Sequence, residues 1–175
     1  MIYYKSMPDS HFSWKDALPS TLVGCCFLAQ MLYGGFFLDH PRIESIKYLG
    51  VALFLVSGVF GLAPVLLFPK RGGVKKGKSF VHTTQLVDTG IYAVMRHPQY
   101  SSFILWALAA MLLFQDWLVV LLGIPMIVLT YYDMMRADQR NIKKFGDPYK
   151  QYMKRVPRVN ILLGFYRAVR RKSKK

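Results

Sequence analysis

The chain has 175 residues, of which 53% are hydrophobic and only 19% are charged, against roughly 25% charged residues in ordinary soluble domains. Its formal net charge is nevertheless +15. This composition argues against a soluble globular protein. It is typical of chains whose apolar stretches lie in lipid while their positive charges face a membrane surface or a nucleic acid.

Two long apolar stretches come first along the chain. Residues 18–38 and residues 48–68 each contain 21 residues without a charged side chain. A helix of this length covers about 30 Å, the thickness of a bilayer's hydrocarbon core, so we predict two transmembrane helices. The cysteines of the sequence, Cys25 and Cys26, are neighbours in the first stretch. Because neighbours on a helix point about 100° apart, we expect packing residues rather than a disulfide.

A third apolar block extends from Ser101 to Tyr132 and is interrupted once, at Gln115-Asp116. As one helix it would be about 48 Å long, too long for a single crossing and with an acid at its centre. Two helices over residues 98–115 and 117–133, joined by a tight turn, fit a bilayer better. The predicted fold is thus an all-α integral membrane bundle of about four transmembrane helices, in a single domain over residues 1–175 with a basic loop at 69–97 and a basic C-terminal region at 134–175.

The basic residues are unevenly divided between the two sides of such a bundle. With four crossings, both termini and the loop at 69–97 share one side, which carries 22 of the 24 basic residues, the other two being Arg42 and Lys47. Because positive charge accumulates in cytoplasmic segments, we expect both termini in the cytoplasm. Asp9 and Asp16 precede the first helix and no small-residue cleavage pattern flanks it, which predicts a retained helix rather than a cleaved signal peptide.

Charged residues gather beside the predicted hairpin. Arg96 and His97 precede Pro98, and proline disfavours helical geometry in the residue before it while favouring the first position of a helix. Asp138 lies about 9 Å beyond the fourth apolar stretch, on a helical face that continues it. An arginine, a histidine and an acid at one depth could hold a charged small molecule. The alternative is interface anchoring by Arg96 and an exposed ion pair for Asp138, which contributes little to stability.

Two short helices are predicted in the C-terminal region. Asp147 is expected to cap the first of them and Pro148 to lie in its first turn, with an apolar face formed by Tyr149, Tyr152, Met153 and Val156. Asn160 is expected to cap an amphipathic segment over residues 161–169 that is followed by a basic run. We expect this segment to lie in the headgroup plane and to attract anionic lipid. Nucleic-acid binding is the competing interpretation, and it is disfavoured because a membrane already accounts for the charge.

Two motifs carry a resemblance to a known family. The run LVDTGIYAVMRHPQY at 86–100, followed after the hairpin by FGDPYKQYMKRVPR at 145–158, resembles the isoprenylcysteine carboxyl methyltransferase family. The runs are also similar to the related phospholipid methyltransferases, and both groups are integral membrane enzymes that use S-adenosylmethionine. The resemblance implies S-adenosylmethionine as cofactor, Arg96 and Asp138 at the reacting groups, and a cofactor pocket of Leu86, Val87, Tyr92, His97, Pro98, Tyr100, Asp138 and Asn141. The sequence has no zinc-ligand spacing, so no metal site is expected.

The chemistry of these residue types is compatible with that implication. Tyr92 and Tyr100 suit a sulfonium, Asp138 suits an ammonium, and Arg96 or His97 suits a carboxylate. The implied function is methyl transfer at the cytoplasmic interface to a lipophilic or amphiphilic acceptor, such as a prenylcysteine-type carboxylate or a phospholipid amine.

Two alternatives remain open at the level of the sequence. The first is a non-catalytic membrane binding or assembly protein of the same fold. It is favoured by Ala137, which stands with Asp138 where the family usually has a glutamate pair. The second is a sterol-type membrane reductase, which would need a nicotinamide site, and the sequence contains no fingerprint for one.

Overall fold

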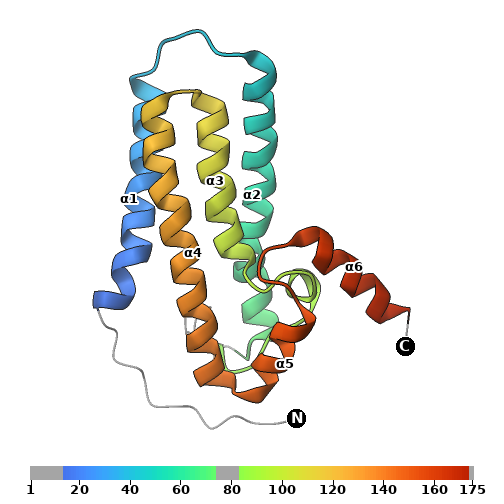
Figure 1. Ribbon diagram of the computed structural model, residues 1–175. Helices are drawn as coiled ribbons and strands as arrows, with labels where there is room; N and C mark the ends of the chain where they lie inside the picture. The colour runs from blue at the N-terminus through green and yellow to red at the C-terminus, as the bar shows by residue number, and fades with distance from the viewer. Residues whose placement is uncertain (1–13, 74–82, 174–175) are drawn as a thin grey trace. The chain divides into compact units, whose positions relative to one another are not determined.

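The computed structural model describes residues 14–73 and 83–173 (Figure 1). The predicted N-terminal arm, the lysines at 75–78 and the last two residues lie outside the described part of the chain. Within it, the secondary structure is helical and contains no strand, which confirms the predicted all-α class. The elements are α1 (Trp14–Phe36), α2 (Glu44–Arg71), the 3-10 helix η1 (Gly90–Ala93), α3 (Pro98–Phe114), α4 (Trp117–Phe145), α5 (Asp147–Arg155) and α6 (Ile161–Lys172).

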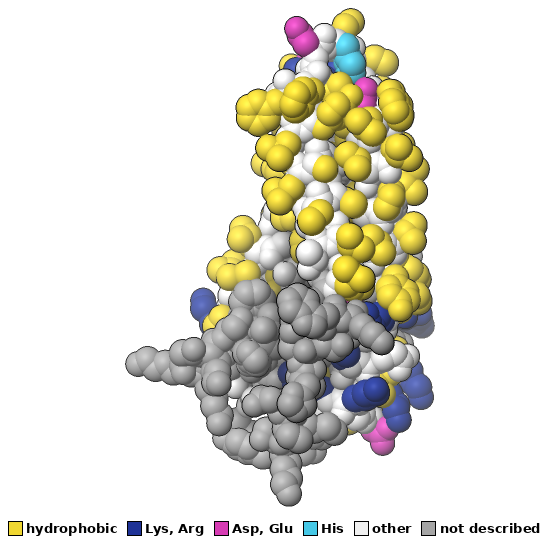
Figure 2. Space-filling model, turned by 90° about the vertical axis from the view of Figure 1, so that its left-hand side faces the viewer, with side chains coloured by type: hydrophobic (Ala, Val, Ile, Leu, Met, Phe, Trp, Pro, Cys, Tyr) yellow, Lys and Arg dark blue, Asp and Glu magenta, His cyan; other side chains and the backbone are white. Residues whose placement is uncertain are grey.

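The long helices have the length and surface of membrane helices. Leu18–Phe36, Glu44–Arg71 and Trp117–Phe145 are each long and apolar enough to cross a membrane, and α3 is a shorter apolar helix of 17 residues. Large apolar side chains point outward on these helices, and Figure 2 shows them covering much of the visible surface. Leu55, for example, is 67% exposed. Exposed apolar surface of this extent is unusual for a soluble protein and normal where the solvent is lipid, so the chain is an integral membrane protein.

The contacts divide the described residues into two compact units. The bundle unit comprises residues 14–61 and 100–135, and the C-terminal unit comprises residues 62–73, 83–99 and 136–173. Both α2 and α4 contribute residues to each unit.

The bundle unit is held together by apolar packing among its helices. Val23 of α1, Ala107 of α3 and Met126 of α4 form its buried core. The rings of Phe27 and Trp106 stack with their centroids 4.9 Å apart. A membrane gives helices no hydrophobic drive to associate, so close packing of this kind supplies the attraction.

The predicted tight turn between α3 and α4 is confirmed. Gln115 takes a left-handed conformation with φ of 50°, and the Asp116 carboxylate accepts a hydrogen bond from the backbone N–H of Leu118 at 2.8 Å. That bond caps the start of α4. The Gln115 side chain also exchanges two hydrogen bonds of 3.0 Å with the backbone of Ile43, so the turn is tied to the connection between α1 and α2.

Helix boundaries in the second half of the chain agree with prediction at one point and differ at two. The helical face is predicted to continue past the apolar span that ends near residue 133, and α4 does continue to Phe145. Gly146 rather than Asp147 is the N-cap of α5, with φ of 63° and ψ of −139°, a conformation that glycine alone adopts readily. Asn160 caps α6 as predicted, since its Oδ1 accepts from the Leu163 N–H at 2.9 Å, but α6 extends to Lys172.

The C-terminal unit has its own small core. The predicted apolar face of α5 is confirmed, because Tyr149, Tyr152 and Val156 are buried together with Phe145 at the end of α4. The hydroxyl of Tyr152 donates to the backbone carbonyl of Tyr92 at 2.6 Å, which joins α5 to η1.

Candidate functional site

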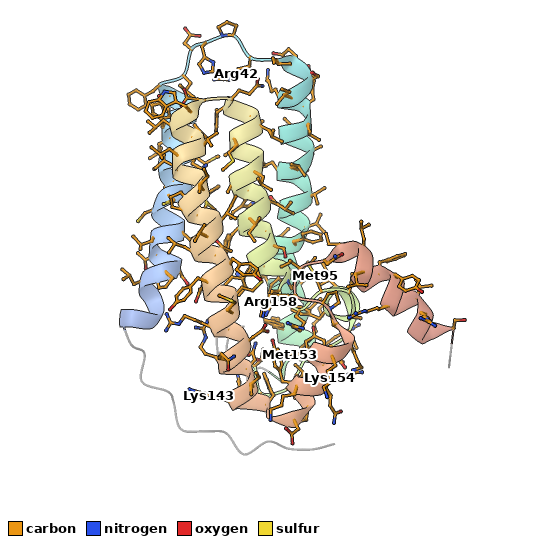
Figure 3. All side chains as sticks on the ribbon, viewed as in Figure 1. Arg42, Met95, Lys143, Met153, Lys154 and Arg158 are labelled. Atoms are coloured by element: carbon orange, nitrogen blue, oxygen red, sulfur yellow. The ribbon has the colours of Figure 1, made fainter. Side chains whose placement is uncertain are left out.

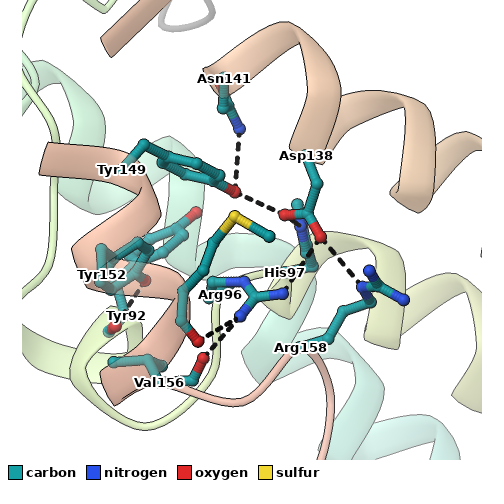
Figure 4. Close-up of polar contacts among 10 residues, drawn as sticks. Tyr92, Arg96, His97, Asp138, Asn141, Tyr149, Tyr152, Val156 and Arg158 are labelled. Atoms are coloured by element: carbon teal, nitrogen blue, oxygen red, sulfur yellow. Dashed lines mark hydrogen bonds and ion pairs between the residues drawn. The ribbon is translucent and has the colours of Figure 1, made fainter. Parts of the chain in front are cut away.

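A buried carboxylate lies at the centre of the C-terminal unit. Asp138 of α4 is 1% exposed and accepts hydrogen bonds from four side chains (Figure 4). Its Oδ1 lies 2.7 Å from the hydroxyl of Tyr149 and 2.7 Å from Nε2 of His97. Its Oδ2 accepts from Nη2 of Arg96 at 3.1 Å and from Nε of Arg158 at 3.0 Å. A carboxylate offers about four acceptor positions, so the described donors use all of them.

The two donors before α3 are placed by backbone pairing with a distant segment. The N–H of Arg96 donates to the Pro157 carbonyl at 3.1 Å, and the N–H of His97 donates to the Arg158 carbonyl at 3.3 Å. These residues lie about sixty positions apart in the sequence. Pro98 begins α3, so His97 stays outside the helix and its N–H remains available for this pairing. The same pairing brings Arg158, which is labelled in Figure 3, to Asp138 (Figure 4).

Arg96 is fixed at more than one point. Besides its bond to Asp138, its Nη1 donates to the carbonyls of Met153 at 2.9 Å and Val156 at 2.8 Å. These carbonyls belong to the C-terminal end of α5, where helix carbonyls lack partners within the helix and the helix dipole attracts a cation. Arg96 therefore holds α5 and Asp138 in a fixed relation.

Burial sets the protonation states of two of the donors. Desolvation lowers the pKa of His97, although the hydrogen bond and the charge of Asp138 act in the opposite direction. The imidazole is therefore neutral at pH 7, and in its Nε2–H tautomer it donates to the carboxylate. Burial raises the pKa of Tyr149, and its bond to Asp138 raises that pKa further, so the phenol keeps the proton that it donates.

The structure brings most of the residues predicted from the sequence into this unit. Arg96, His97 and Asp138 are in direct contact, and Asn141 donates from Nδ2 to the Tyr149 hydroxyl at 3.4 Å. The others that lie in the C-terminal unit are Leu86, Val87, Tyr92 and Pro98. Tyr92 is buried, and its ring stacks on Phe68 with centroids 5.1 Å apart.

Tyr100 differs from the other predicted residues. It lies half-buried in the first turn of α3 and belongs to the bundle unit. Its predicted contact with a cofactor, like the binding roles of the other residues, stays a prediction.

Sequence reasoning missed two of the four donors to Asp138. The pattern places Tyr149 only on an apolar face, although its position in the Phe-Gly-x-x-Tyr motif was a usable signal. Arg158 follows Pro157 outside any helix, where no periodicity indicates its direction, so nothing in the sequence pointed to its contact with Asp138. Within residues 14–73 and 83–173, no group of three or more His, Cys, Asp or Glu side chains is placed to hold a metal ion.

The fold and the site define a helical integral membrane protein with a fully bonded acid in its C-terminal unit. The model of the isoprenylcysteine carboxyl methyltransferase family matches residues 76–144, a segment that contains Arg96, His97, Asp138 and Asn141. Over this segment the chain is similar to that family.

Two curated relatives are similar to this chain. The Protein-S-isoprenylcysteine O-methyltransferase of Schizosaccharomyces pombe is 33% identical over 93 residues, which cover 48% of this chain and 39% of that protein. The Protein-S-isoprenylcysteine O-methyltransferase B of Arabidopsis thaliana is 26% identical over 159 residues, which cover 84% of this chain and 79% of that protein. The match thus spans well under half of the first relative's length and about four fifths of the second's. No solved structure matches the chain significantly.

Proposed function

We propose that this protein is an S-adenosylmethionine-dependent membrane methyltransferase whose acceptor is a prenylcysteine-type carboxylate. The family match and the names of the two relatives support the reaction class. The observation that carries the proposal is the convergence of Arg96 and His97 with Asp138, all from the matched segment, on one buried cluster.

The residues present fit a charged cofactor with a carboxylate group. The Nε atom of Arg96 is buried and has no hydrogen-bond partner among the described residues. A buried N–H without an acceptor is costly, and a carboxylate oxygen would satisfy it. S-adenosylmethionine, when bound, would supply an electrophilic methyl group on a sulfonium. Aromatic side chains such as Tyr92 and Tyr149 suit that positive charge.

The bonding of Asp138 favours a positioning role over direct contact with the donor's ammonium. All of its acceptor positions are used by protein donors, so an ammonium could bind only by displacing one of them. Asp138 instead holds Arg96 and Arg158 in place. In this proposal the ammonium is bound by a neutral acceptor, and the side-chain oxygen of Asn141, on the same helix face as Asp138, is a candidate.

The cluster suits a carboxylate acceptor better than an amine. An amine would first have to lose a proton, and the lowered pKa of His97 makes this histidine a weak base. A carboxylate needs no base. Arg158, whose side chain is 29% exposed compared with 7% for Arg96, is the donor of the cluster that reaches the surface, and its guanidinium suits an incoming carboxylate.

Calorimetry with the detergent-purified protein tests the cofactor. We expect saturable binding of S-adenosylmethionine and S-adenosylhomocysteine. In a transfer assay with labelled donor, we expect label on a prenylcysteine with a free carboxylate, but none on its methyl ester or on phosphatidylethanolamine. Arg158→Gln should lower transfer to the carboxylate while leaving donor binding intact, and Lys154→Gln, an exposed cation lost from α5, should change neither.

Failure to bind the donor, with protein shown to be folded, would contradict the proposal. It would favour the alternative of a non-catalytic membrane protein of the same fold, which Ala137 and the fully bonded Asp138 also support. Oxidation of a reduced nicotinamide would instead support the reductase alternative. Transfer to phosphatidylethanolamine would keep the reaction class and refute the carboxylate acceptor.

A further inference from the structure

The helix α6 has one face that packs against the protein and one that does not. On the packed face, Gly164 is buried so closely against η1 and the residue after it that a Cβ atom there would meet the backbone carbonyl of Val94. Four residues on from Gly164, Ala168 is half-buried on the same side, and Arg167 is half-buried at the border between the two faces. The opposite face carries large apolar side chains with high exposure, at Leu162 (85%), Phe165 (63%), Tyr166 (60%) and Val169 (51%).

These four side chains form a continuous strip. Their spacing of three, one and three residues places them on a single helix face. Exposure of an apolar strip of this size to water is unfavourable. No described residue covers it, so the strip is open to a partner.

The basic residues next to this strip indicate the kind of surface to which it binds. From Ile161 to Lys175 the sequence has six basic residues and no acidic one. Four of them belong to α6 itself, at residues 167, 170, 171 and 172, and the other two follow at residues 174 and 175. An apolar face flanked by basic residues fits a surface of acyl chains and anionic headgroups, which attracts the basic residues. The chain is an integral membrane protein, so such a surface is always within its reach.

We propose that α6 is an interfacial helix that docks on an anionic lipid surface. Leu162, Phe165, Tyr166 and Val169 enter the boundary between headgroups and acyl chains, and Arg167 and Arg170 contact lipid phosphates. The packed face with Gly164 stays on the protein. Docking therefore also restrains Asn160, the cap of α6, which lies two residues after Arg158.

Fluorescence from a probe on α6 in the full-length protein tests this proposal. In a background of Cys25→Ser and Cys26→Ser, Leu162→Cys is labelled with an environment-sensitive dye and the protein is placed in lipid nanodiscs. We expect a blue shift, and loss of emission to nitroxide-bearing lipids, in discs of phosphatidylcholine with phosphatidylglycerol. Both effects should be weaker in phosphatidylcholine alone. The same dye on Gln151→Cys, an exposed position of α5, should show neither difference.

Charge variants separate lipid docking from general electrostatics. Arg167→Gln with Arg170→Gln should reduce the response of the residue 162 probe to phosphatidylglycerol. Lys150→Gln with Lys154→Gln removes the same number of charges from α5 and should not reduce it. A residue 162 probe that stays in water in both lipids, or responds equally to both pairs of substitutions, would overturn the proposal. None of these readouts uses methyl transfer, so the result is independent of the proposed function.

Discussion

At the scale of single residues, the site depends on one acid that is fully bonded inside the protein. Burying a carboxylate is costly unless it is paired and hydrogen-bonded. Asp138 meets both conditions, since two arginines face it and a neutral histidine and a phenol complete its bonding. Removing its charge would leave Arg96, which is 9% exposed, facing other donors without a counterion.

Asp138→Asn is therefore expected to destabilise the protein strongly, by about 3–5 kcal/mol, as the loss of one partner of a buried ion pair typically does. The new amide would also point N–H groups at existing donors. Asp147→Asn is the matched control, because the Asp147 side chain is 79% exposed and pairs with Lys150 at the surface. Thermal unfolding in detergent measures both, and equal midpoints for the two variants would refute the structural importance of the cluster.

A second prediction concerns pH and rests on His97. Burial lowers the pKa of His97 in the folded protein, whereas an unfolded histidine has a pKa of about 6.5. Below about pH 6.5 the unfolded chain therefore binds a proton that the folded protein does not, so the contribution of His97 to stability is present above this pH and declines below it. Unfolding midpoints measured between pH 5 and pH 8 should fall more steeply on acidification in the parent protein than in His97→Gln. Parallel curves would show that His97 does not titrate in this way.

At the scale of elements, local sequence signals predicted where the helices lie better than they predicted the residues at which the helices begin and end. The apolar stretches and the interruption at Gln115-Asp116 predicted α1 to α4, because each signal is contained within a few turns of sequence. The assignment of Asp147 as a cap was wrong because two good capping residues are adjacent and only Gly146 can take the required backbone conformation. The end of the last helix was misplaced because α6 continues from Val169 into the basic run.

Gly146 should be less tolerant of substitution than a helical glycine such as Gly58. Gly146 has φ of 63°, and a Cβ atom added there would meet no atom within 4 Å, so Gly146→Ala would be opposed by backbone strain alone, at about 1–3 kcal/mol. Gly58 in α2 also has open space where a Cβ would lie, but it has helical geometry, so Gly58→Ala should be neutral or stabilising by about 0.5–1 kcal/mol. Unfolding midpoints of the two variants test this contrast. A stable Gly146→Ala protein would mean that the turn into α5 is not fixed by this glycine.

At the scale of the whole molecule, composition predicted the membrane environment but not the complete site. The expectation that Arg96, His97 and Asp138 lie at one depth followed from helix lengths alone, and the structure places them in contact. The backbone hydrogen bonding of residues 96–97 with residues 157–158 could not be predicted. Pairing between two segments that are far apart in the sequence produces no periodic pattern in either segment. The contact of Arg158 with Asp138 could therefore be identified only from the structure.

The orientation of the chain is a further proposal at this scale. Four crossings and the distribution of basic residues predict that residues 154 and 173 face the cytoplasm, whereas residue 39, between α1 and α2, faces the opposite side. In the cysteine-free background, single cysteines at these positions can be labelled in sealed cells with a membrane-impermeant maleimide. We expect Asp39→Cys to react from outside and Lys154→Cys and Ser173→Cys to react only after lysis. Labelling of all three from outside would exclude this topology.

The sequence positions of the four donors to Asp138 have a consequence for biosynthesis. Arg96 and His97 are made before the acid, whereas Tyr149 and Arg158 are made after it. Because a chain emerges from the ribosome in order, Asp138 first meets only half of its partners while α4 is being inserted. The cluster can close only once the segment after α5 has been translated and has folded back onto the residues before α3. Final assembly of the site is therefore a late event that follows membrane insertion, and an incomplete chain would carry an acid with only half of its bonds.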